Sequence, residues 1–257
     1  MIGRLAVIAL LWCVAAMAHA QVPLRVQVEG AVRNPGTFEV PEGSRLSVAV
    51  LAAMPTADAY PTGASLLRRD AIREQLRLKA ALAHDLEQLA QADGAALRAT
   101  ADALARQLDA MPVTGRIHTL LDPRRVEIEP AANLPLAEGD RIVYPRRPHT
   151  VRIVGAVAAP CEVAHTPLRN AALYLDACPQ LSADRDWLYA IQPDGAIQRL
   201  GIALWNRSPP QPLAPGAVLY VPLPARALRG LDVDFNAEFA TFLATQTVTD
   251  ASEGDMP

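Results

Sequence analysis

An internal duplication constrains the fold of this chain more than any other feature of its sequence. Residues 28–36 and 153–161 share the pattern Gly-Ala-Val-x-x-Pro at an offset of 125 positions, and the alignment continues without a gap for the next 17 positions. A second pair of segments, residues 136–145 and 213–222, recurs at an offset of 77. The first copy therefore carries an insert of 48 residues.

The inserted residues, 64–111, predict a helical hairpin. The segment contains no proline and is rich in alanine, leucine, arginine, glutamine and glutamate, which favour helices. Leucines recur at helical spacing on both sides of Asp93-Gly94, which interrupts the pattern. The hairpin thus has an apolar seam of its own, and we expect its many arginines to lie on a solvated face.

Without the insert, both copies predict the same order of elements. An alternating strand, at residues 25–32 and 150–157, is followed by a tight turn, a second strand and a short helix at residues 44–53 and 168–177. Two or three strands complete each copy. This is the order of a β-grasp domain, in which a helix packs on one face of a small sheet. The expected fold class is α+β, with two β-grasp domains.

The first 20 residues have the composition of a secretory signal peptide. A basic start precedes an apolar run of 12 residues, and Ala18-His19-Ala20 fits the cleavage rule. This run is shorter than the roughly 20 residues that a membrane span needs, so we expect an exported chain with no transmembrane segment. The expected domains are a first β-grasp domain at 21–148, a second at 149–224, an amphipathic helix at 225–247 and a disordered tail at 248–257.

The two cysteines that follow the signal peptide, Cys161 and Cys178, suggest a disulfide in an oxidising compartment. Cys161 opens a strand and Cys178 closes the helix that runs back along it. These two elements have similar lengths, roughly 16 and 15 Å, so the sulfurs can meet near the turn. The alternative is a pair of buried free thiols.

Residues 28–40 resemble the soluble-ligand-binding β-grasp (SLBB) motif, and residues 138–145 and 216–222 resemble its final strand. The chain is similar over nearly its whole exported length to the periplasmic capsule-biosynthesis GfcC-like family. Two such modules, a helical insert in the first, Val-Thr-Gly-Arg at 113–116 and a helix after the second module carry this resemblance. The second module departs from the motif: Cys161 replaces a glycine, and Ala217 replaces the aspartate of Gly-Asp.

The resemblance implies a periplasmic role in assembling or exporting a surface polysaccharide, capsule or exopolysaccharide. The expected partners are the polysaccharide itself or the export machinery, including an outer-membrane exporter. The resemblance implies no catalysis.

The residues themselves offer little support for an enzyme, a metal site or a nucleic-acid-binding protein. The net charge of −3 lacks the basic surplus that phosphate contacts need. The histidines are scattered, and no phosphate-binding loop or Gly-x-Ser-x-Gly motif is present. We expect no catalytic residue, no metal and no cofactor. An enzyme that cleaves glycan would need a pair of carboxylates. The candidates also have the positions of residues that cap turns or lie on strand faces. They are Asp122, Glu127, Glu129, Glu138 and Asp140.

Arginine is the better candidate for ligand binding. Arg116 follows the turn by which the insert returns to the sheet, and a guanidinium there can hold a carboxylate or an acidic sugar. The alternative is that Arg116 ties the hairpin to the sheet through carbonyls or a carboxylate. Two pairs of neighbouring arginines could form a basic edge that binds the ligand. The alternative is that these side chains are simply solvated at the edge of the sheet. They are Arg124, Arg125, Arg146 and Arg147.

The segment after Pro224 predicts an amphipathic helix with one apolar face. We consider two roles for this face: binding to a partner or membrane surface, and docking on its own module. Its candidate partner-binding residues are Leu231, Phe235, Phe239 and Phe242.

The sequence thus favours a non-catalytic accessory factor that binds glycan or an export component. Two alternatives remain open: a periplasmic enzyme that modifies the glycan, and a structural adaptor without a glycan site.

Overall fold

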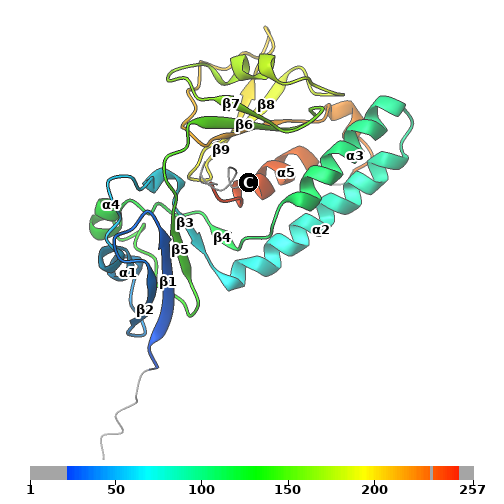
Figure 1. Cartoon of the computed structure of the whole chain (residues 1–257). Helices are drawn as coiled ribbons and strands as arrows, with labels where there is room; N and C mark the ends of the chain where they lie inside the picture. The colour runs from blue at the N-terminus through cyan, green and yellow to red at the C-terminus, as the bar shows by residue number, and fades with distance from the viewer. Residues whose placement is uncertain (1–21, 232–233, 249–257) are drawn as a thin grey trace, which may run out of the picture.

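Two five-stranded sheets of the same topology organise the chain (Figure 1). The computed structural model describes residues 22–231 and 234–248. The expected signal peptide and all but the first residue of the expected tail lie outside this range. The strand order is β2-β1-β5-β3-β4 in the first sheet and β7-β6-β10-β8-β9 in the second. In each sheet one pair is parallel, β1 with β5 and β6 with β10, and the other pairs are antiparallel. The predicted duplication and the α+β class are confirmed.

The first module interrupts its sheet with the helical hairpin. The sheet strands are β1 (Leu24–Gly30), β2 (Gly36–Val40), β3 (Ser65–Leu67), β4 (Arg116–Ile117) and β5 (Arg141–Tyr144). The helices are α1 (Leu46–Ala53), η1 (Pro61–Gly63), α2 (Arg69–Gln91), α3 (Ala95–Ala110) and α4 (Pro123–Ile128).

The hairpin begins at Arg69 rather than at the expected residue 64. Residues 65–67 instead pair with β5 and β4. Leu66 is fully buried in the first core. Burial and sheet pairing therefore override the helix propensity of these residues.

The second module repeats the same plan without an insert. It contains β6 (Thr150–Gly155), β7 (Cys161–Ala164), η2 (Ala171–Ala177), β8 (Trp187–Ile191), β9 (Ile197–Gly201) and β10 (Val218–Val221). The helix expected at 168–177 is a shorter 3₁₀ helix. Leu168 has a φ of 61°, in the left-handed region, so no right-handed helix runs through it. The chain continues with η3 (Ala225–Leu228) and α5 (Phe235–Ala244).

The first sheet keeps one face open to solvent. Along β1 the side chains of Val26 and Val28 are buried, while Arg25 and Gln27 are exposed. Helices α1 and α4 lie against each other, and α1 contacts β1 and β2. This alternation is the pattern of a sheet with one covered face.

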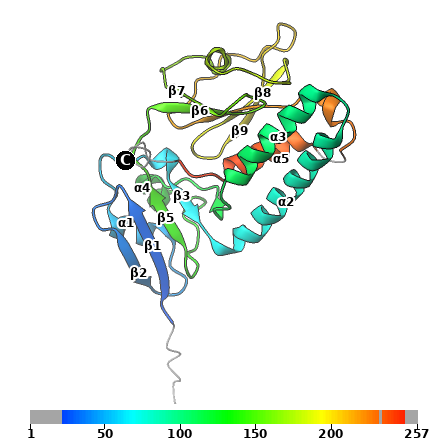
Figure 2. The same ribbon diagram turned by 45° about the vertical axis from the view of Figure 1, so that its right-hand side comes forward.

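The second sheet is covered on both faces. Figures 1 and 2 show α5 beside the hairpin, and α3 contacts β6 while α5 contacts α2, β8 and β9. The seam leucines of the hairpin share one core with the second module and α5: Leu82, Leu86, Leu104 and Leu108. The insert of the first module thus completes the core of the second. The near-continuous apolar run of β10 agrees with a strand buried on both sides.

The predicted disulfide between Cys161 and Cys178 is present. It joins the start of β7 to the residue after η2, with a Cα–Cα separation of 6.1 Å. The bond is consistent with an oxidising compartment. Within the described residues, no helix is both long and apolar enough to span a membrane.

Candidate functional site

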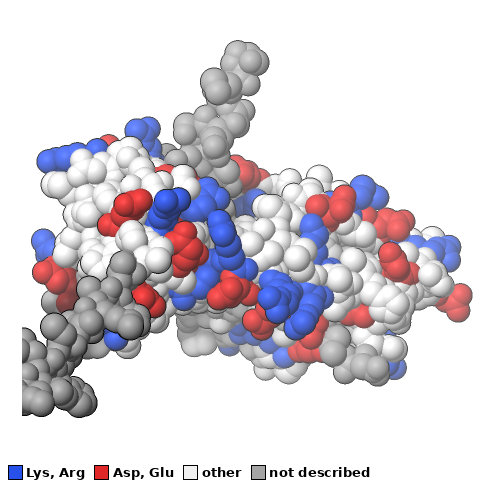
Figure 3. All heavy atoms as spheres, turned by 90° about the horizontal axis from the view of Figure 1, so that it is seen from below, with Lys and Arg blue, Asp and Glu red and all other residues white. Residues whose placement is uncertain are grey.

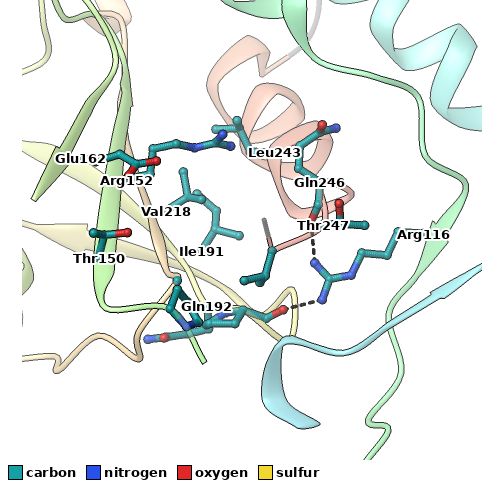
Figure 4. A pocket seen from close by; sticks show the side chains of 14 residues that line it. Arg116, Thr150, Arg152, Glu162, Ile191, Gln192, Val218, Leu243, Gln246 and Thr247 are labelled. Atoms are coloured by element: carbon teal, nitrogen blue, oxygen red, sulfur yellow. Dashed lines mark hydrogen bonds between the residues drawn. The ribbon is translucent and has the colours of Figure 1, made fainter. Parts of the chain in front are cut away.

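A cavity of about 300 Å³ lies between the second sheet and the C-terminal end of α5 (Figure 4). Strands β6, β7, β8 and β10 supply one wall, and residues after α5 supply another. Arg116 reaches the cavity from the first module. Figure 4 shows its guanidinium and that of Arg152 entering from opposite sides. The polar residues among those lining the cavity are Arg116, Thr150, Arg152, Glu162, Gln192, Gln246 and Thr247.

Arg116 is held by backbone carbonyls. It follows Gly115, whose φ of +75° and close approach to the Arg68 carbonyl require glycine. The side chain is 5% exposed and donates to the carbonyls of Pro193 and Gln246, the latter at 2.6 Å. Burial lowers the pKa of Arg116 to about 10. The Nε atom has no hydrogen-bond partner in the described structure. Arg116 therefore joins both modules and α5 while lining the cavity.

Arg152 differs from Arg116 in its partners. It lies on β6 opposite Glu162 of β7. Within the described residues, its side chain makes no hydrogen bond or ion pair. Burial lowers the pKa of Arg152, and the charge of Glu162 partly offsets this effect. The cavity thus holds the buried guanidinium of Arg116, the partly buried guanidinium of Arg152 and the carboxylate of Glu162. Its two positive charges suit a carboxylate or another anion.

Sequence reasoning missed Arg152 and Glu162. Arg152 corresponds in the repeat to Gln27, which is exposed on the open face of the first sheet. The hairpin and α5 cover the equivalent face of the second sheet and convert an exposed position into a partly buried one. The sequence feature that could have pointed to Arg152 is its position as the one charged residue in the apolar strand of residues 151–155.

The other candidate arginines lie on the surface. Arg124 and Arg125 are exposed on α4, and Arg125 forms an ion pair with Glu129 at 2.8 Å. Arg146 and Arg147 are exposed after β5, where Arg147 lies 5.9 Å from the ring centre of Tyr60. The second pair, with His149, borders a separate open cavity of about 640 Å³. The structure does not bring either pair into the cavity of Arg116.

The face seen from below carries charges of both signs (Figure 3). Basic side chains gather near its middle, with acidic side chains beside them. An extended basic surface of the kind that binds nucleic acid is not visible on this face.

The candidate carboxylates of the first module are mostly engaged in local structure. Asp122 caps α4, and Glu138 accepts a hydrogen bond from the backbone N–H of Arg25. Asp140 is buried and pairs with Arg68 at 2.7 Å. Glu127 is exposed on α4. Within the described residues, no group of three or more potential metal ligands occurs.

The apolar face of α5 lies inside the molecule. Phe235, Phe239 and Phe242 are fully buried, and the ring of Phe239 stacks on Tyr220 at 4.9 Å between centres. Leu231 is partly buried against the same core. A partner can reach the phenylalanines only if α5 leaves the second sheet.

The two sheets, the inserted hairpin and the C-terminal helix define a tandem β-grasp protein with a cavity that Arg116 and Arg152 enter. Residues 20–147 match the N-terminal domain of capsule biosynthesis GfcC proteins, and residues 159–248 match the C-terminal domain. The chain belongs to the capsule biosynthesis GfcC family. It is also 34% identical over 154 residues to the uncharacterized protein YjbG of Escherichia coli (strain K12). That match covers 60% of this chain and 61% of YjbG.

Proposed function

We propose that this protein is a periplasmic, non-catalytic accessory factor in the assembly or export of a surface polysaccharide. It acts by binding the glycan or a component of the export machinery. Membership of the capsule biosynthesis family supports the process. The disulfide supports the compartment.

The proposed binding role rests on Arg152 and on the lack of close partners for its guanidinium among the described residues. Its guanidinium enters the cavity without a hydrogen bond or ion pair from the described residues. Arg152 is partly buried, so its charge loses part of its hydration without gaining a close partner, and an anionic ligand would offset that cost. A carboxylate of an acidic sugar has the charge and planar geometry that a guanidinium binds in a bidentate manner.

Arg116 contributes to this cavity in a second way. Its N–H groups already donate to the carbonyl of Pro193, in the turn between β8 and β9, and to the carbonyl of Gln246, after α5. We propose that it holds these walls in place and adds positive potential, while Arg152 makes the direct contact with the ligand.

The process is tested by measuring surface polysaccharide in a strain that lacks the gene. We expect loss or shortening of the polymer, and restoration by the wild-type gene. An unchanged amount and chain length, under conditions where the polymer is made, would contradict the proposed process.

The cavity is tested by complementing the same strain with Arg152→Met, which keeps the stem and removes the charge. We expect this variant to accumulate normally and to restore less polymer than wild type, whereas Arg124→Ala serves as a matched control and restores it fully. Full restoration by Arg152→Met would favour the adaptor without a glycan site.

A further inference from the structure

Both tryptophans of the described chain lie together at one end of the second sheet. Trp187 opens β8, and Trp205 lies in the loop that follows β9. Their ring centres are 6.3 Å apart and their planes are at 89°. The pair therefore forms an aromatic corner. This corner is distinct from the cavity of Arg116, which contacts β8 at its opposite end, Ile191.

Trp205 is presented to solvent by an ordered loop. This residue is 72% exposed, although burying a large aromatic side chain would stabilise the fold. The indole N–H donates to Oδ1 of Asp186 at 3.3 Å, and the side chain of Asn206 donates to the Asp186 carbonyl at 2.9 Å. The backbone N–H of Ser208 donates a hydrogen bond to the carbonyl of Gly201 at 2.9 Å. The loop thus fixes the ring, and ring faces rather than the N–H remain for contact.

Polar groups of both signs surround the aromatic corner. The Arg199 guanidinium lies 3.9 Å from the ring centre of Trp187, and it makes no hydrogen bond or ion pair within the described residues. Asp184 uses Oδ1 to accept two backbone N–H groups at 2.7 and 3.0 Å. Its other oxygen carries no hydrogen bond from the described residues. These groups border a cavity of about 230 Å³ that Trp187 and Tyr189 also line.

We propose that Trp187, Trp205, Arg199 and Asp184 form a saccharide subsite. A pyranose ring has an apolar C–H face that packs on an indole, and hydroxyl groups that donate to carboxylates and accept from guanidinium. The cavity has Trp187 and Tyr189 in its wall, and Trp205 stands beside Trp187 outside the lining, so an aromatic surface and a few polar groups lie together as this chemistry needs. A protein interface would need about 800 Å² on this side, whereas the exposed apolar residues here are confined mainly to Leu204 and Trp205. The subsite rests on the proposed function and adds a second contact to the same glycan.

Intrinsic fluorescence offers a direct test, because a chain from Gln21 onward contains only these two tryptophans. The probes are oligosaccharides prepared by partial hydrolysis of the host's surface polysaccharide, with maltohexaose and tetragalacturonate as defined neutral and acidic probes. We expect at least one probe to change the emission on titration, and calorimetry to give the same affinity.

Trp205→Ala should weaken this binding about ten-fold or more without lowering the melting temperature, because the ring is exposed. Leu204→Ala is the matched control: this neighbour is 87% exposed but offers no ring, so it should bind as wild type does. Trp205→Phe, which keeps a ring face, should retain part of the affinity.

The subsite is overturned if wild type binds none of the probes, or if Trp205→Ala binds them as tightly as wild type. It is also overturned if Trp205→Ala loses affinity only for a purified export component, since the corner is then a protein interface. The polymer yield of the deletion strain is measured separately, so these outcomes leave the test of the proposed function intact.

Discussion

At the scale of single residues, two arginines enter one cavity with different burial and different partners: Arg116 is buried and Arg152 is partly buried. The terminal N–H groups of Arg116 donate to carbonyls of Pro193 and Gln246, although its Nε has no partner among the described residues. Arg152 lies opposite Glu162 on the neighbouring strand and forms no ion pair within the described residues. The sequence predicted Arg116 from its turn and left open whether it binds a ligand or ties elements together. The carbonyl contacts are those of a tie, and its place in the cavity keeps a ligand role as part of the proposal.

Replacing Arg116 by Met should lower the free energy of unfolding by about 1–3 kcal/mol. The variant leaves the buried carbonyls of Pro193 and Gln246 without their donor, and an unsatisfied buried acceptor costs this much. Chemical denaturation measures the change. Arg124→Ala, an exposed arginine of α4, should change it by less than about 0.5 kcal/mol. If Arg116→Met is as stable as wild type, the arginine is not a structural tie.

His118 should make the folded state sensitive to acid. Partial desolvation and then the charge of Arg116 lower the pKa of this exposed histidine below 6.5. The unfolded chain consequently binds a proton at this residue at a higher pH than the folded chain does. Stability is therefore lost as the pH falls through about 6.5 toward the folded pKa.

Unfolding experiments between about pH 7 and pH 5 check this dependence. We expect His118→Gln to show a shallower decline in the free energy of unfolding than wild type. His84→Gln changes an exposed histidine of α2 and should leave the slope as it is. Equal slopes in wild type and His118→Gln would assign the pH dependence to other groups.

At the scale of elements, the hairpin is attached to the second sheet by polar as well as apolar contacts. The Gln107 side chain of α3 donates to the Gly155 carbonyl at 3.0 Å and accepts from the Gly155 N–H at 2.9 Å. Gln75 of α2 makes a similar pair of bonds, to the carbonyl of Arg116 and the N–H of Gly115, and this pair ties the hairpin to the first sheet. The 3.6-residue pattern predicted both helices, but it contained no sign of these amide contacts.

Gln107→Leu should lower the free energy of unfolding by about 2 kcal/mol, because both backbone groups of Gly155 lose a buried partner. Gln91→Ala, at the exposed end of α2, is the control and should have little effect. Hydrogen exchange should also show faster exchange at the Gly155 N–H. Unchanged exchange at this amide would contradict the attachment.

At the scale of the whole molecule, the two modules do not divide the core as they divide the sequence. The first core contains α1, α4 and the first sheet. The second contains the second sheet, α5 and the hairpin that belongs to the first copy of the repeat. The core of the second module is therefore completed by the hairpin, which lies in the first copy of the repeat.

Leu104→Ala, in α3, should destabilise the second sheet rather than the sheet of its own copy. Leu104 is fully buried in the second core, and a cavity of this kind costs about 2–5 kcal/mol. Hydrogen exchange should show loss of protection in β6, β8 and β10 with little change in β1. Val126→Ala, buried in the first core, should show the reverse pattern. Equal loss in both sheets for either variant would mean that the molecule unfolds as one unit.

The amino-acid pattern alone predicts the helices and strands and their repetition. The Gly-Ala-Val-x-x-Pro repeat, the two offsets and the seam leucines predict the two α+β modules and the hairpin, because local backbone preference and hydrophobic period operate over short distances. The same local order brought Cys161 and Cys178 together. The boundaries of these elements also depend on sheet partners far along the chain. Residues 65–67, expected to be helical, form a strand for this reason.

Which faces of the two sheets are covered follows from the three-dimensional packing and not from the local sequence. Gln27 and Arg152 occupy equivalent positions of the repeat, but the hairpin and α5 lie over the second alone. The docking of α5 turned a candidate partner-binding face into core, and the folding of the β9 loop placed Trp205 beside Trp187. These contacts join residues distant in sequence, so packing energy rather than local preference selects them.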